Sequence, residues 1–156
     1  MTSPITLADF EALARAIIEP GAWDYYAGGA GDERSLADNR AAWDRLRLRP
    51  RVLVDVSRRD LATDAFGTSL AHPVIVAPMA SHDLAHADAE PATARGAAAA
   101  GALMTLSTIS SVPMEEVVAA APDAPRWFQL YAPAKRDDCE ALVRRAADAG
   151  YGAIVV

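Results

Sequence analysis

Apolar residues in the first third of the chain recur with helical spacing. LADFEALARAII places five of them on one helical face, namely Leu7, Phe10, Leu13, Ala14 and Ile17. We expect Pro20 to end this helix. AWDYYAGG and residues 35–43 predict two further short helices, and the alternation of arginine with apolar residues over 45–52 predicts an extended segment with a solvated arginine edge.

From Asp60 onward, short apolar runs alternate with helix-like segments. Two short runs on either side of Phe66 predict a small hairpin. Four apolar strands follow, and they are centred near Ile75, Met104, Gln129 and Ile154. Strands that alternate with helices predict a parallel sheet with helices on its face. We therefore divide the chain into N-terminal helices with an extended lead-in, residues 1–60, and a strand–helix region, residues 61–156.

Two α/β architectures accommodate this repeat, an open doubly wound sheet and a TIM (β/α)8 barrel. APMASHDLAH follows the first strand, where a dinucleotide-binding sheet needs a glycine-rich turn, so the barrel is favoured. A complete barrel takes about 250 residues and eight strands. We expect this chain to hold the N-terminal helical segment and about the first four strands, ending within the fourth, as the front half of a longer protein.

Composition excludes several classes of function. The net charge of −6 argues against nucleic acid as a partner, because phosphate-binding proteins cluster lysine and arginine on one surface. The single cysteine, Cys139, cannot form an internal disulfide, and the sequence predicts no metal site. The sequence has neither a signal-peptide pattern nor an apolar run of about 20 residues. These features predict a cytoplasmic protein with no membrane partner.

Polar residues gather where the predicted strands end, and in barrels of this kind the active site lies there. Ser107 and Thr108 follow the second strand, while Gln129 and Tyr131 leave the third strand on the same face. An amide, hydroxyls and a phenol in an apolar mouth suit a planar ligand with hydrogen-bonding edges. The alternative is that these groups only satisfy one another or the backbone.

Four motifs together resemble the N-terminal half of the FMN-dependent 2-hydroxy-acid oxidases and dehydrogenases. They are WDYYAGGAGDERSLADNRAAWDRLRLRPRVLVDV, PVIVAPMASH, ATARGAAAAGALMTLST and FQLY, and they occur in the family's order over nearly the whole chain. The family includes glycolate oxidase, lactate oxidase and mandelate dehydrogenase. The resemblance implies an oxidoreductase that uses FMN to oxidise a small L-2-hydroxy acid to a 2-oxo acid, with a homo-oligomeric full-length enzyme.

The resemblance also implies residue roles for the flavin. Pro78, Met79 and Ala80 match the segment behind the flavin ring, with the backbone N–H of Ala80 near flavin N5. Ser107 and Gln129 match residues that hydrogen-bond the flavin's polar edge. Many family members have a small residue at Met79 and a Gln or Tyr at His82, so contacts on this side of the flavin are expected to differ in detail.

Three further residues match substrate-binding positions. Tyr25 matches the residue that hydrogen-bonds the substrate carboxylate, and Tyr131 matches the catalytic phenol that stabilises charge on the substrate oxygen. Ile109 occupies a position that is aromatic in glycolate oxidases, which suggests a roomier pocket.

The resemblance leaves several questions open. The family's catalytic histidine, substrate-binding arginine, flavin-binding lysine and phosphate-binding loops lie beyond Val156. The identity of the 2-hydroxy acid and of the electron acceptor is open. Two alternatives stand beside this function: another FMN barrel enzyme, such as a type 2 isopentenyl diphosphate isomerase, or a non-catalytic half-barrel subunit.

Overall fold

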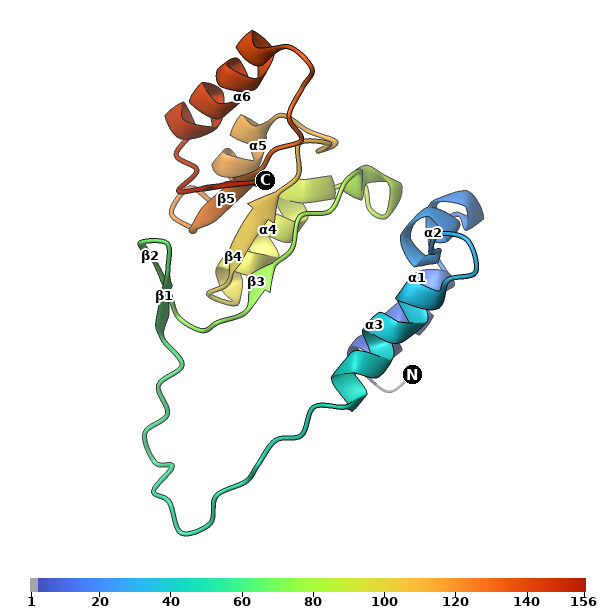
Figure 1. Ribbon diagram of the computed structural model, residues 1–156, viewed down its shortest axis with the longest axis vertical. Helices are drawn as coiled ribbons and strands as arrows, with labels where there is room; N and C mark the ends of the chain where they lie inside the picture. The colour runs from blue at the N-terminus through green and yellow to red at the C-terminus, as the bar shows by residue number, and fades with distance from the viewer. Residues whose placement is uncertain (1–2) are drawn as a thin grey trace. The chain divides into compact units, whose positions relative to one another are not determined.

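The structure is a computed structural model that describes residues 3–156 (Figure 1). The chain forms two compact units, Met1–Arg59 and Asp60–Val156. The first contains helices and an extended segment, and the second contains all the strands of the described residues.

Three helices form the first unit, and they confirm the helices expected there. They are α1 (Leu7–Arg15), α2 (Pro20–Ala27) and α3 (Arg34–Asp44). The expectation that the first helix runs to Pro20 was wrong, because α1 ends at Arg15 and Pro20 begins α2. Proline at a first helical position sacrifices no hydrogen bond. The carboxylate of Glu19 also caps α2 by accepting from the backbone N–H groups of Gly21 and Ala22, at 2.8 and 3.3 Å.

The glycine that follows α2 has a steric cause. A Cβ atom at Gly28 would lie 2.7 Å from the carbonyl oxygen of Asp24, which is too close for any side chain. The last part of this unit, residues 46–59, is extended or bent and largely exposed, as the alternating arginines predict.

The second unit begins with the expected hairpin. β1 (Thr63–Ala65) pairs antiparallel with β2 (Thr68–Leu70) across Phe66 and Gly67. Both connecting residues are left-handed, with φ of 50° and 75°. This geometry suits a two-residue hairpin connection, because its twist matches that of the flanking strands.

A four-stranded parallel sheet follows, with the strands in chain order. Its strands are β3 (Ile75–Val76), β4 (Leu103–Leu106), β5 (Arg126–Gln129) and β6 (Ile154–Val155). The connections contain the short 3-10 helix η1 (His82–Leu84) and the helices α4 (Ala89–Ala99), α5 (Met114–Ala120) and α6 (Arg136–Asp148). The predicted strand–helix repeat is therefore confirmed.

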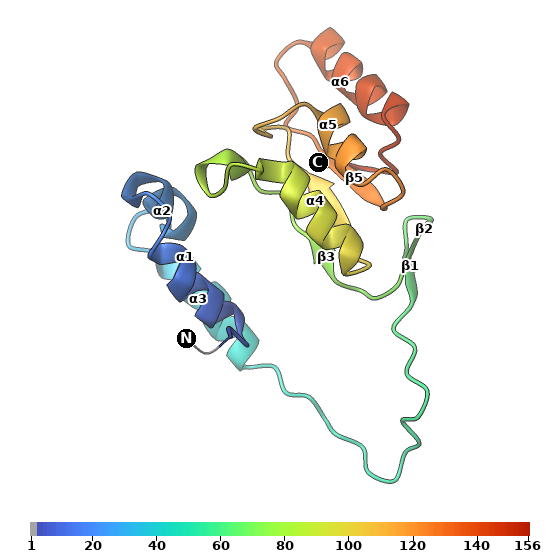
Figure 2. The ribbon, with the colours of Figure 1, turned by 180° about the vertical axis from the view of Figure 1, so that it is seen from behind.

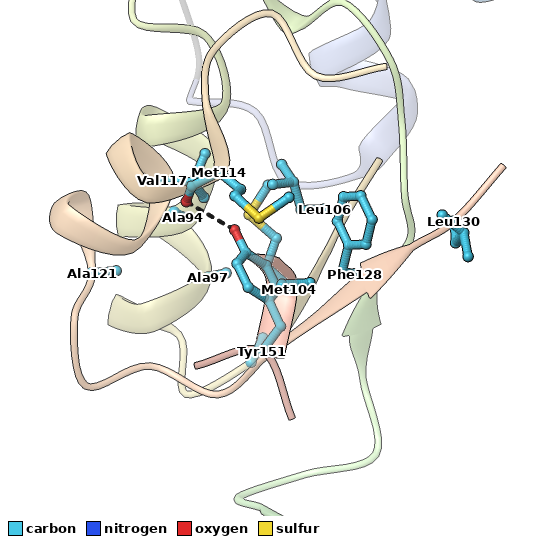
Figure 3. Close-up of a cluster of buried hydrophobic side chains, with 12 residues drawn as sticks. Ala94, Ala97, Met104, Leu106, Met114, Val117, Ala121, Phe128, Leu130 and Tyr151 are labelled. Carbon is cyan, nitrogen blue, oxygen red and sulfur yellow. Dashed lines mark hydrogen bonds between the residues drawn. The ribbon is translucent and has the colours of Figure 1, made fainter. Parts of the chain in front are cut away.

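Helices α4, α5 and α6 cover one face of this sheet, which we call the helix face (Figure 2). Met104, Leu106 and Phe128 point into a core that also contains residues of all three helices (Figure 3). Tyr151 closes this core, and its hydroxyl donates to the carbonyl oxygen of Met114 at 3.0 Å.

The opposite face of the sheet, which we call the inner face, carries a second and smaller apolar cluster. Leu103 and Trp127 pack there with Leu70 of the hairpin. The indole N–H of Trp127 donates to Thr68 Oγ1 at 3.2 Å. Its ring packs edge to face against that of Phe66, with the two ring centroids 5.8 Å apart. The hairpin therefore packs against the inner face at the end where the strands begin.

Candidate active site

The inner face becomes polar toward the carboxyl ends of the strands. Because side chains alternate along a strand, Thr105 and Ser107 follow Leu103 on this face, and Gln129 and Tyr131 follow Trp127. Leu106 pairs with Phe128 in the register between β4 and β5, so Ser107 and Gln129 lie next to each other at the following position. Gln129 is buried, whereas Tyr131 is exposed.

Gln129 uses one end of its amide within the protein. Its Oε1 accepts from Ser107 Oγ at 3.3 Å and from the backbone N–H of Thr108 at 3.4 Å. Within the part of the chain that the structure describes, no protein acceptor contacts its Nε2 group. The amide is thus fixed by its oxygen and keeps two N–H donors for a ligand.

Thr108 links the two strand ends, a contribution that the sequence did not reveal. Its hydroxyl donates to the carbonyl oxygen of Gln129 at 2.5 Å and accepts from the backbone N–H of Tyr131 at 3.0 Å. A threonine directly after a strand is the only sequence signal for this link. It fixes the backbone of Tyr131 just beyond the last residue of β5.

The segment after β3 presents backbone groups to solvent. Pro78 and Met79 are exposed and Ala80 is half-buried. In residues 3–156 the backbone N–H of Ala80 has no hydrogen-bond acceptor. The next residue, Ser81, donates its backbone N–H to the carbonyl oxygen of Ile109 at 3.1 Å, which ties this segment to the one after β4.

The remaining site residues fall in two places. Ile109 is 55% exposed, and its backbone N–H donates to Ser107 Oγ at 3.1 Å, so it belongs to the same group of strand ends. Tyr25 belongs to the other unit, on α2, where its ring centroid lies 5.3 Å from that of Tyr26. The second unit therefore brings together Pro78, Met79, Ala80, Ser107, Ile109, Gln129 and Tyr131.

His82 does not join these residues. It is buried, and its Nδ1 lies 3.0 Å from Thr93 Oγ1 of α4. Its backbone N–H donates to Glu90 Oε1 at 3.2 Å. Burial opposes ionisation of Glu90, yet hydrogen bonds from Ser111, from its own backbone and from His82, together with the charge of His82, hold its pKa below the usual value.

The available groups fit the polar edge of a flavin. An isoalloxazine ring presents carbonyl oxygens and ring nitrogens that accept hydrogen bonds. The Gln129 amide and the Ala80 N–H are donors without acceptors among residues 3–156. The described residues contain no group of three or more His, Cys, Asp or Glu side chains that could hold a metal ion. No helix among them is long and apolar enough to cross a membrane.

Sequence comparison connects this site to known enzymes. The family described as FMN-dependent dehydrogenase matches residues 14–156. The chain is 46% identical to the L-lactate oxidase of Nostoc sp. over 99% of its own length and 43% of that protein. It is also 46% identical to glycolate oxidase 1 of Zea mays, over 95% of the chain and 40% of that protein. The chain thus spans less than half the length of these relatives.

Solved structures agree with this relationship. A structure of mandelate oxidase superposes with a TM-score of 0.93 at 42% identity, covering 98% of this chain and 44% of that one. A variant of mandelate oxidase solved with an FMN adduct gives a TM-score of 0.89 at 41% identity, over 94% and 44% of the two chains. The predicted fold class is confirmed, because the α/β region matches part of the TIM barrel of these oxidases. The chain therefore belongs to the family of FMN-dependent 2-hydroxy-acid oxidases and dehydrogenases.

Proposed function

We propose that this chain supplies the N-terminal, flavin-facing and substrate-facing part of an enzyme that oxidises an L-2-hydroxy acid to a 2-oxo acid. The observation that carries the proposal is the Gln129 amide, which is fixed at its oxygen and has no acceptor for its N–H groups among residues 3–156. Because the amide is held by its oxygen, its N–H groups are oriented in advance toward a ligand that accepts hydrogen bonds.

The cofactor side of the proposal uses the ends of β3, β4 and β5. Pro78, Met79 and Ala80 would lie behind the flavin ring, and the Ala80 N–H would donate toward N5. Ser107 and Gln129 would hold the polar edge of the ring. When bound, FMN accepts the two electrons that the hydroxy acid loses, while the protein orients both molecules.

The substrate side of the proposal rests on Tyr131. Its exposed phenol lies two residues beyond Gln129, on the same face. The hydroxyl of Thr108 fixes its backbone by accepting from the Tyr131 N–H. A hydroxyl in this position can donate to the substrate oxygen as charge develops there. Tyr25 would hold the substrate carboxylate, and Ile109 would line the pocket beside the C2 substituent.

The test compares the full-length gene product that carries this chain with residues 1–156 alone. We expect the full-length protein to purify yellow, with one FMN per chain, and to lose its visible absorbance when an L-2-hydroxy acid is added without oxygen. Residues 1–156 alone should be colourless, because the family's phosphate-binding loops are not among them. A full-length protein that neither contains nor binds FMN would contradict the proposal.

A further inference from the structure

Glu90 is a carboxylate that none of the proposed roles uses. It lies in the first turn of α4, and its side chain is completely buried. Burial of a carboxylate is costly unless hydrogen bonds compensate for its lost hydration. The contacts of Glu90 therefore indicate which part of the structure its burial stabilises.

One oxygen of Glu90 joins the two loops that form the site. Oε1 accepts from the backbone N–H of His82, in the loop after β3, at 3.2 Å. It also accepts from the backbone N–H of Ser111, in the loop after β4, at 2.9 Å. The other oxygen, Oε2, is buried without a hydrogen-bond partner among the described residues. The contribution of Glu90 to the link between the loops thus depends on a single acceptor atom.

Other contacts join the same two loops, but nearer the surface. The Ser81 N–H donates to the carbonyl oxygen of Ile109 at 3.1 Å. Ser111 Oγ accepts from the backbone N–H of Asp83 at 3.1 Å and donates to its carboxylate at 2.7 Å. Asp83 and Ser111 are exposed, so water competes with their bond. Glu90 itself, by contrast, is completely buried.

The backbone between the loop and α4 needs such support. Ser81 and Ala89 both have left-handed backbones, with φ of 57° and 43°. Residues with a Cβ atom rarely adopt this conformation, and they keep it only where surrounding contacts enforce it. Glu90 follows Ala89 directly and reaches back to His82, which follows Ser81, so its carboxylate spans both strained positions.

We propose that Glu90 is a positioning residue for the flavin site, a role that rests on the proposed function. By joining the backbones of His82 and Ser111, it sets the separation between the Ala80 N–H and the Ser107–Gln129 pair. These groups would contact different atoms of one rigid ring, so a change in their separation weakens cofactor binding. Glu90 itself contacts neither the cofactor nor the substrate.

The first measurement is the hydrogen-exchange rate of the His82 and Ser111 backbone amides in the full-length protein, with and without FMN. Glu90→Ala should speed exchange of the His82 and Ser111 amides about 10-fold, the effect of one lost hydrogen bond. Glu90→Gln keeps an acceptor at the same distance and should stay within about threefold of wild type. Glu116→Ala, which removes an exposed carboxylate of α5, should change neither amide.

The second measurement follows the flavin. Glu90→Ala should raise the dissociation constant of FMN about 10-fold or more and shift its visible absorbance maximum, with recovery in Glu90→Gln. If the alanine variant does not fold, Glu90→Asp replaces it, because its shorter side chain keeps the charge and draws the carboxylate away from the two amides. Unchanged exchange, or faster exchange with unchanged flavin affinity and spectrum, would overturn the inference alone. A wild-type protein that binds no FMN would overturn the proposed function, and this inference with it.

Discussion

The two faces of the four-stranded sheet differ in how they change along the strands. On the helix face, Met104, Leu106, Phe128 and Leu130 are apolar, and Arg126 at the start of β5 is satisfied by the carbonyl oxygens of Ala121 and Pro122. On the inner face, Leu103 and Trp127 are apolar where the strands begin, and Ser107 and Gln129 are polar where they end. Phe128 and Gln129 are adjacent in sequence and both are buried, yet they point to opposite faces.

This difference separates the requirements of folding from those of function. Burial of apolar surface accounts for the helix face, because α4, α5 and α6 remove it from water. It does not account for the polar end of the inner face, where the N–H groups of the Gln129 amide have no acceptor among residues 3–156. The oxygen of this amide serves the fold through Ser107 and Thr108, whereas its N–H groups are the part that we assign to a ligand.

The largest effect is expected at the polar end of the inner face. Tyr131→Phe removes one hydroxyl and little volume, so folding and FMN content should be unchanged. If the phenol stabilises charge on the substrate oxygen, kcat should fall about 10- to 1000-fold. Steady-state kinetics with a 2-hydroxy acid measure this, and a kcat within twofold of wild type would remove Tyr131 from the mechanism.

Tyr25→Phe gives the matched contrast to Tyr131→Phe. A carboxylate contact is made equally in the ground state and the transition state, so its loss should raise KM and leave kcat nearly unchanged. A fall in kcat as large as that of Tyr131→Phe would instead assign both hydroxyls to the chemical step.

A smaller effect is expected from Ile109, at the edge of the same face. Its side chain is 55% exposed beside the strand ends, so a larger ring there would occupy space next to the substrate. Ile109→Trp should lower kcat/KM for mandelate relative to glycolate, and discrimination by pocket size is typically about 10- to 200-fold. Specificity constants for glycolate, lactate and mandelate test this. An unchanged order of preference would show that Ile109 does not set the pocket size.

The smallest effect is expected from changing an ion pair between two helices that cover the helix face, and it should appear in thermal stability. Glu115 of α5 pairs with Arg145 of α6 through two hydrogen bonds of 2.7 Å. The hydrogen bonds from Arg145 lower the pKa of Glu115 from 4.5 to about 2. A lowered carboxylate pKa adds stability that is complete above the unfolded value and is lost as the pH falls toward the folded one.

Thermal unfolding of Glu115→Gln tests this pair. The variant should melt slightly below wild type at pH 7, and the difference should shrink as the pH falls from 4.5 toward 2. Glu116→Gln, at the next residue of α5, is the control, because the described residues show no ion pair for it. FMN affinity should be equal in all three proteins. A difference that grows on acidification would contradict the assignment.

Periodicity predicted the strands and helices because each element's apolar spacing reflects the face that it buries. The polar pair of Gln129 and Tyr131 was predictable for the same reason, since alternate positions on a strand share a face. The end of α1 was not predictable from Pro20, because proline can equally begin the next helix.

The supporting contacts of the site were hidden from sequence reasoning. Glu90 lies in the alanine-rich stretch EPATARGAAAAG, where a carboxylate looks like an ordinary surface charge. Its contact with Ser111 joins residues 21 positions apart, and Thr108 contacts Gln129 over the same separation. Such contacts depend on how the strands align, which local spacing does not encode.

We propose that the inner face contacts FMN in the full-length protein, while the helix face stabilises the fold. The most direct test changes the two neighbours to the same residue, as Gln129→Met and Phe128→Met, in the full-length protein. Gln129→Met keeps the length of the side chain without its amide, and should raise the FMN dissociation constant about 10- to 100-fold. It also removes the acceptor of Ser107 and Thr108, so the FMN-free protein should lose about 1–2 kcal/mol of stability, and the comparison therefore rests on FMN affinity. Phe128→Met should cost about 1–2 kcal/mol of stability and leave FMN affinity within about threefold of wild type. Equal effects of the two changes on FMN affinity would contradict the claim.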